Sequence, residues 1–165
     1  MLGIWERPPK ARDWEVPELE VTAFVDAAFE TWDVWRLYGD PHYWETTLAE
    51  WASRHGDKRV LQWDTRRTRA MALAIRAFAQ AIEAGDVSHD GDPTLARHIG
   101  NAQKRDSNLI DEERKPLFTI SKERDDSPHK IDGAAAAVLS WRARLDALAA
   151  GALEQQVVLE GSLMR

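Results

Sequence analysis

One stretch decides the fold class of this sequence: Val34-Trp35-Arg36-Leu37-Tyr38-Gly39-Asp40-Pro41. Its first five residues are rich in β-branched and aromatic side chains, which predicts a short strand, and Gly-Asp-Pro ends that strand with turn residues. Apolar residues at helical spacing then predict a helix over residues 44–56, which ends at Gly56. A strand over residues 60–63 and a helix from Thr65 or Thr68 to Gly85 repeat this order. Alternating strands and helices indicate βα units and a mainly parallel sheet covered by helices.

The segments next to this unit continue the pattern. Upstream, apolar residues spaced as on one helix face predict a helix over residues 18–32, and Ile4-Trp5 is predicted as the end of a strand that Pro8-Pro9 closes. Downstream, residues 86–89 are predicted as a short strand. Asp92-Pro93 is predicted to open a helix that runs to about Lys104.

The C-terminal third predicts two loops, a strand and a long helix. Residues 106–115 are interpreted as a charged loop, residues 117–120 as a strand antiparallel to Val87, and residues 121–128 as a polar loop. Ser127 and Pro128 are a typical helix opening, so the last helix is predicted to start there. Its four consecutive alanines would let it lie close against the sheet.

The composition limits the class of protein. A chain of 165 residues without cysteine fits one domain in a reducing cytoplasm, with no disulfide scaffold, zinc–thiolate site or thiol nucleophile. No uncharged run approaches the roughly 20 residues that a membrane span needs, which predicts a soluble protein without a membrane partner. The net charge of −6 argues against a general phosphate-binding surface, so any contact with nucleic acid is expected to be local.

Asp40 is the first candidate site residue. It stands just beyond the carboxyl end of a predicted strand, the edge where open α/β sheets commonly bind ligands. The alternative is purely structural, since Asp before Pro is an ordinary turn.

Asp132 is the second candidate, at the border of the apolar face of the last helix. Burial of an unpaired carboxylate is costly, so Asp132 must be exposed, paired with a base such as Lys130, or bound to a cation. The alternative is that Asp132 only stabilises the helix dipole.

Carboxylates favour hard cations such as Mg²⁺ or Mn²⁺, the ions of two-metal phosphodiester hydrolysis, although such sites usually need three or more acidic ligands. The five histidines form no HExxH-type pair, and no phosphate-binding glycine loop or Gly-x-Ser-x-Gly elbow occurs. The densest basic cluster is a candidate DNA contact or a solvated helix face, and it comprises Arg66, Arg67 and Arg69. Most of the eight tryptophans, Trp32 among them, are predicted to lie in the core.

Four phrases carry a resemblance to a known family, and they are Trp5-Glu6-Arg7-Pro8, Leu37 to Pro41, Gly91 to Ala102, and Lys130 to Ala135. In order and spacing they resemble the C-terminal nuclease domain of phage large terminase subunits, over nearly the whole chain. The resemblance implies an RNase H-like mixed sheet flanked by helices. It also implies a Mg²⁺- or Mn²⁺-dependent endonuclease that cuts concatemeric DNA during packaging.

The resemblance also implies roles for particular residues. Asp40 matches the second acidic ligand and Asp132 the third, both catalytic and metal-binding. Lys130 matches a basic position that pairs with a carboxylate or contacts phosphate, and Lys122 is a second such candidate. His98 and Asn101 match a helix near the site, without an assigned role. The implied partners are double-stranded phage DNA and, in the full-length protein, the terminase small subunit and portal, in the cytoplasm of a bacterial host.

The chain departs from that family at its start. An ATPase domain and a first strand with the first aspartate normally precede the matched phrases, so residues 1–165 are expected to form a partial nuclease domain without that strand. A second hypothesis is a catalytically inactive prophage remnant that binds DNA or a partner. A third is another RNase H-like enzyme, such as a transposase or resolvase, which predicts a further acidic residue at a strand end.

Overall fold

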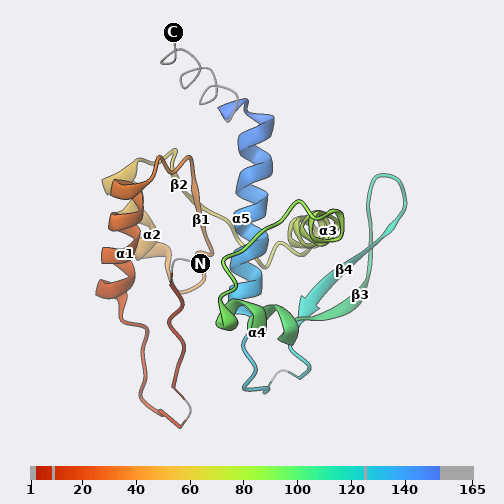
Figure 1. The fold of residues 1–165 in the computed structure, drawn as a ribbon, viewed down its shortest axis with the longest axis horizontal. Coiled ribbons are helices and arrows are strands. Elements are labelled where there is room, and N and C mark those ends of the chain that lie inside the picture. Colours follow the sequence, from red (N-terminus) through yellow and green to blue (C-terminus); the bar gives the residue numbers. More distant parts are fainter. Residues whose placement is uncertain (1–2, 9, 125, 153–165) are drawn as a thin grey trace.

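The protein has a mixed α/β fold, seen in a computed structural model that describes residues 3–8, 10–124 and 126–152 (Figure 1). Its elements, in chain order, are α1 (Glu18–Thr31), β1 (Leu37–Gly39), α2 (Glu45–His55), β2 (Val60–Gln62), α3 (Thr68–Ala84), α4 (Pro93–Asn101), β3 (Gln103–Ile110), β4 (Pro116–Ser121) and α5 (Asp132–Ala149).

The predicted βα unit is confirmed. β1 and β2 pair in parallel, with Leu37 opposite Val60 and Gly39 opposite Gln62, and α2 makes the crossover between them. Such a crossover is needed because parallel neighbours cannot be joined by a tight turn. The predicted single mixed sheet is not observed in the described part of the chain, where β3 and β4 form a separate antiparallel pair.

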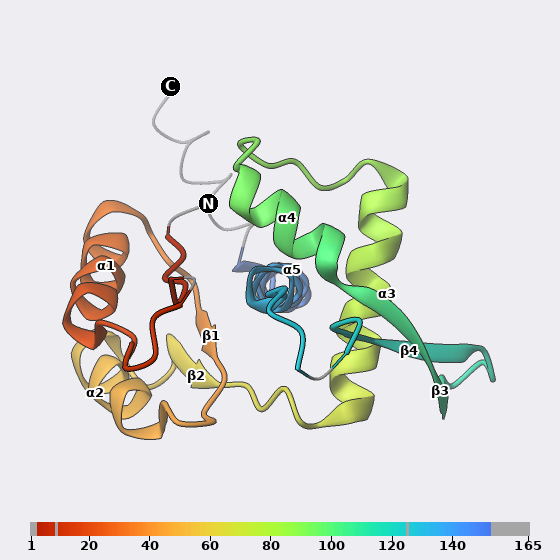
Figure 2. The ribbon, with the colours of Figure 1, turned by 90° about the horizontal axis from the view of Figure 1, so that it is seen from below.

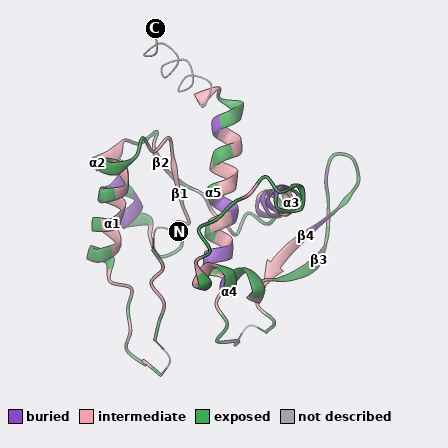
Figure 3. Ribbon diagram, viewed as in Figure 1, coloured by how far each residue is buried: buried purple, intermediate pink, exposed green. Residues whose placement is uncertain are grey.

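α5 stands between two groups of elements, with α1, α2, β1 and β2 on one side and α3, β3 and β4 on the other (Figure 2). Buried residues lie on α3 and along α5, where the two helices pack (Figure 3). The core of this contact consists of Met71, Ala74, Ile75, Phe78, Val138 and Leu139. A second cluster of Leu48, Trp51 and Val60 is covered by partly buried residues of α1.

The small residues at the start of α5 are buried in part, since Ala136, the third of the four consecutive alanines, is exposed. Gly133 and Ala134 are buried, and Ala134 is only 4% exposed. α5 also contacts β1, because the Tyr38 hydroxyl donates a hydrogen bond of 2.8 Å to Asp146. This bond and burial of the ring raise the pKa of Tyr38, burial being the larger cause.

Three predictions about strands are wrong. Residues 3–8 and 86–89, all within the described ranges, form no strand. Residues 106–110, predicted as loop, belong to β3, which pairs with β4 at Asp106 and Ile110 and has an irregularity between them. Val87 does not pair with β4 but packs against the core of α3 and α5. β3 shows no apolar alternation because most of its residues are exposed, so the pairing with β4 alone defines it.

The start of the last helix was also predicted wrongly. α5 begins at Asp132, and Ser127 instead accepts a hydrogen bond of 3.1 Å from the backbone N–H of His129 in the preceding turn. Trp32 is a further correction, since it follows α1 and is 51% exposed. No helix in the described part of the chain combines the length and the hydrophobicity that a bilayer crossing requires.

Two isoleucines on α3 test the core assignment. Ile75 is 4% exposed and packs against α5, whereas Ile82 is 47% exposed on the same helix. We expect Ile75→Ala to lower the free energy of unfolding by roughly 2–5 kcal/mol, because it leaves a cavity. Ile82→Ala should change it by less than about 0.5 kcal/mol. Urea unfolding measures both, and equal losses would contradict the described contact between α3 and α5.

Candidate functional site

α4 is the helix that organises the candidate site. Asp92 caps it, because its carboxylate accepts hydrogen bonds from the backbone N–H groups of Thr94 and Leu95 at 2.8 and 3.0 Å. Pro93 occupies the first turn, where its missing N–H costs nothing. The predicted Asp92-Pro93 opening is therefore confirmed, although the helix ends at Asn101, before Lys104.

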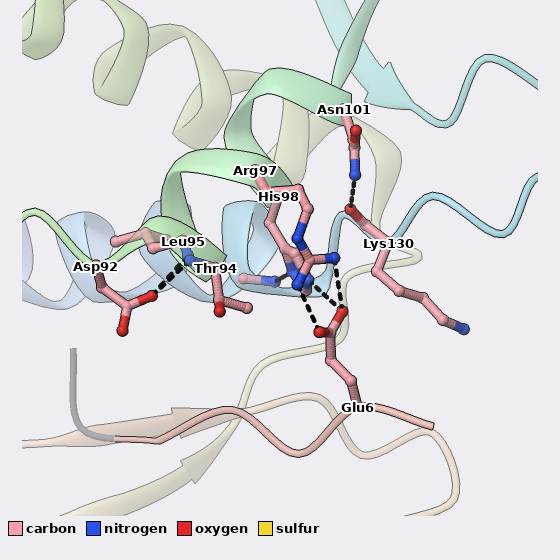
Figure 4. A network of polar contacts seen from close by, with 9 residues as sticks. Glu6, Asp92, Thr94, Leu95, Arg97, His98, Asn101 and Lys130 are labelled. Carbon is pink, nitrogen blue, oxygen red and sulfur yellow. Dashed lines mark hydrogen bonds and ion pairs between the residues drawn. The ribbon is translucent and has the colours of Figure 1, made fainter. Parts of the chain in front are cut away.

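His98 projects from α4 and has no exposed surface. Its Nδ1 accepts a hydrogen bond of 2.8 Å from the backbone N–H of Gly133, and its Nε2 lies 2.7 Å from the Glu6 carboxylate (Figure 4). A nitrogen that accepts carries no proton, so Nε2 must be the donor. The ring is therefore the neutral Nε2–H tautomer.

Glu6 joins the N-terminal segment, residues 3–8, to α4. Its two oxygens accept hydrogen bonds from the Arg97 guanidinium at 2.6 and 3.2 Å. These bonds, and secondarily the bond from His98, lower the pKa of Glu6 to about 2. Glu6 raises the pKa of Arg97 in return. Glu6 therefore remains a carboxylate at neutral pH.

Two further contacts hold α4 against the start of α5. The Asn101 side chain donates a hydrogen bond of 2.9 Å to the backbone carbonyl of Lys130, whose amine points away from Glu6 and His98 (Figure 4). At Gly133, an added Cβ would lie 2.9 Å from Nδ1 of His98. Only glycine thus allows the imidazole to approach the helix this closely.

A cavity of about 430 Å³ opens beside this contact between α4 and the start of α5. Its lining includes Trp5, Trp14 and Trp44 together with aliphatic residues. The charged or titratable residues of the lining are Glu6, Arg7, His98, Lys130 and Asp132. The cavity thus combines apolar walls with both signs of charge.

Asp132 is the first residue of α5 and is exposed at this cavity. Of the three states that the sequence left open, exposure is the one observed. Its backbone neighbours are held on both sides, through the carbonyl of Lys130 and the N–H of Gly133. The backbone around Asp132 is therefore held in place, while its carboxylate is exposed.

Asp40 lies elsewhere, at the end of β1, and does not line this cavity. Its carboxylate accepts a hydrogen bond from the Thr65 hydroxyl and another, of 3.3 Å, from the backbone N–H of His42. This bonding is that of a turn residue. No group of three or more His, Asp or Glu residues suited to a metal ion occurs among the described residues.

Two of the basic candidates, Arg66 and Arg69, make side-chain contacts with the protein. Arg66 pairs with Asp64 at 3.0 Å, which is the main cause of the raised pKa of Arg66, while Asp40 adds to it. Arg69 donates a hydrogen bond of 2.6 Å to the carbonyl of Ile110. Arg67 is exposed just before α3, and Lys122 is half-buried just after β4.

Glu6 is the site residue that the sequence did not identify. It lies in one of the four phrases behind the resemblance, but a lone glutamate near a predicted strand carries no chemical signal. Its role depends on His98, 92 positions away in the sequence. Asn101 lies in the same helix as His98, and its partner Lys130 is 29 positions away.

The fold and site therefore define a mixed α/β chain whose N-terminal segment, α4 and α5 meet at a histidine beside a cavity. Comparison with known proteins shows similarity to the Gene 13 protein of Mycobacterium phage L5, 30% identical over 157 residues, and to the Gene 13 protein of Mycobacterium phage D29, 31% identical over the same length. Each match covers 90% of this chain and 25% of the relative, so the chain spans about a quarter of the length of these relatives.

No protein-family model and no solved structure matches the chain. These findings correct the expected assignment to the phage large terminase family. The relatives are named Gene 13 proteins, and this name does not identify a terminase. No family model assigns the chain to the terminases either. The expectation of a phage origin is supported, since the relatives are phage proteins.

The contact at Gly133 yields a matched pair of variants. Gly133→Ala should lower the free energy of unfolding by about 1–3 kcal/mol, because the new methyl group collides with His98. Gly100→Ala should raise it by about 0.5–1 kcal/mol, since Gly100 lies in α4 with nothing within 4 Å of an added Cβ. Urea unfolding distinguishes them, and a stable Gly133→Ala would contradict the close approach.

The low pKa of Glu6 predicts a pH dependence of stability. A pKa of about 2 in the folded state against 4.5 in the reference state means that the carboxylate stabilises the fold fully above about pH 4.5. This contribution is lost as the pH falls towards 2. We expect the urea midpoint of the wild type to exceed that of Glu6→Gln at pH 7, with the difference shrinking below pH 4.5. A difference that stays constant down to pH 2 would contradict the assignment.

Proposed function

We propose that this chain contributes Asp40 and Asp132 to a Mg²⁺- or Mn²⁺-dependent site that cleaves double-stranded DNA, within a longer phage protein. The observation that carries the proposal is the state of Asp132. Among the described residues, no donor pairs with its carboxylate, although the backbone on both sides is held by α4. A metal ligand needs this combination of a fixed backbone and an open carboxylate.

The donor chemistry also supports the proposal. Carboxylate oxygens are the ligands that Mg²⁺ and Mn²⁺ prefer, and both aspartates retain exposed surface. Asp40 follows β1 and Asp132 begins α5, and these two elements are in contact, although the bond from Tyr38 reaches α5 at Asp146, about four turns beyond Asp132. A bound ion would supply activation of the attacking water and stabilisation of the leaving oxygen.

The fold component of the proposal is an RNase H-like arrangement. In it, the parallel pair β1–β2 belongs to a larger mixed sheet, and α5 is the helix that presents the last acidic ligand. Two aspartates are fewer than a two-metal site needs. Because the relatives are about four times as long as the matched region, we propose that further ligands come from other parts of such a protein.

One observation favours a second candidate function, a DNA- or partner-binding module without cleavage. Within the described ranges no three-ligand group exists, and the Asp40 carboxylate already accepts two hydrogen bonds. DNA binding that weakens with salt but needs no metal would support this alternative.

Paramagnetic broadening by Mn²⁺ tests whether the two carboxylates converge. In ¹⁵N-labelled wild type, titrated Mn²⁺ should broaden the backbone amides near Asp40 and Asp132 together, because one ion would contact both. Asp40→Asn or Asp132→Asn should weaken this binding at least about tenfold at both places. Asp57→Asn, in the exposed turn before β2, serves as the control and should not change it. Broadening at only one aspartate would contradict a shared site.

Cleavage is tested separately. A longer polypeptide that includes this chain should nick supercoiled plasmid with Mn²⁺, and Asp132→Asn should reduce nicking at least about a hundredfold. Equal nicking by wild type and variant would refute the assignment.

A further inference from the structure

We infer that His98 is a positioning residue for Asp132, and that Glu6 holds His98 in the tautomer which this role requires. The inference rests on the proposed function only for the role of Asp132 as a metal ligand. Its structural part concerns the first turn of α5.

α5 lacks a cap from its own sequence. Its N-cap residue is Ile131, which has no polar side chain, and it makes no side-chain cap hydrogen bond. The first N–H groups of a helix need acceptors from elsewhere. The N–H of Gly133, the second residue of α5, finds its acceptor in His98 of α4, 35 positions away in the sequence. His98 therefore caps α5 from another helix.

Glu6 determines which imidazole nitrogen is free to accept. With Nε2–H directed at the Glu6 carboxylate, the proton is kept away from Nδ1, so Nδ1 presents a lone pair to Gly133. Arg97 keeps Glu6 ionised through two hydrogen bonds. This relay runs from residue 6 through His98 to the residue next to Asp132, in the manner of the partners that orient metal ligands from behind.

The inner end of this relay, His98 and Gly133, is enclosed, whereas Glu6 and Arg97 keep exposed surface. His98 is completely buried, and Gly133 is buried against it. The bond from Asn101 to the Lys130 carbonyl holds the chain on the other side of Asp132. Loss of the Gly133 bond would free the first turn of α5 and with it the direction of the Asp132 carboxylate.

Two substitutions at His98 separate the two bonds. The amide oxygen of Asn stands near the place of Nδ1, so His98→Asn retains an acceptor for Gly133. The longer Gln carries its amide near the place of Nε2, so His98→Gln retains a donor for Glu6 but loses the acceptor. A purely structural role of the buried ring would make the two variants equally impaired.

Hydrogen exchange of the Gly133 amide is the readout that needs no metal. We expect His98→Gln to lower its protection at least about tenfold, and His98→Asn to stay within about threefold of the wild type. Urea midpoints of both variants establish that they fold. In the wild type, imidazole ¹⁵N shifts should show the neutral Nε2–H tautomer. Equal protection of Gly133 in all three proteins, equal losses in both variants, or the opposite tautomer would overturn the inference.

Mn²⁺ affinity provides the second arm. His98→Gln should weaken Mn²⁺ binding at Asp132 roughly tenfold, whereas His98→Asn should leave it nearly unchanged. If Asp132→Asn abolishes binding but His98→Gln does not weaken it, the positioning role is overturned and the proposed function stands. If wild type binds no Mn²⁺ while Gly133 loses protection only in His98→Gln, the proposed function is refuted and the capping of α5 by His98 is supported.

Discussion

Burial of the His98 imidazole with hydrogen bonds at both nitrogens is the interaction on which the arrangement of the site depends. An unsatisfied buried nitrogen costs about 1–3 kcal/mol, so the ring requires an acceptor on one side and a donor on the other. The acceptor, Glu6, comes from the N-terminal segment, and the donor, Gly133, from the start of α5. One side chain therefore specifies how three distant parts of the chain meet, which apolar packing alone would define less sharply.

The helices and the parallel pair were predictable because their signals are local. Gly56 and Gly85 end α2 and α3, and Asp92 caps α4, each through contacts within a few residues. Residues 117–120 were predictable as a strand, but their partner β3 was not, because most of its residues are exposed and leave no periodic apolar pattern. The start of α5 was missed for a related reason: Ser127 and Pro128 fit a helix opening locally, yet the acceptor that begins this helix is His98 on another element.

The candidate site likewise contains residues that the sequence identified and residues that it did not. Asp40 and Asp132 could be selected from the sequence because a carboxylate at a strand end or on an apolar helix border is a local anomaly. The roles of Glu6, His98 and Gly133 could not, since each is defined by partners at least 35 positions away. A buried histidine also looks like any other histidine in a sequence, and its tautomer follows only from the atoms on either side of the ring.

The two aspartates are unequally prepared to bind a cation. At Asp132, α4 bonds the flanking backbone and leaves the carboxylate open, so among the described residues no hydrogen bond to the carboxylate has to break for an ion to bind. At Asp40, the Thr65 hydroxyl and the His42 N–H occupy both oxygens, and an ion must share them or compete. Arg66 also adds a positive charge near Asp40, which opposes a cation there. In the proposed site, Asp132 is therefore the stronger ligand, and recruitment of Asp40 requires rearrangement of the turn after β1.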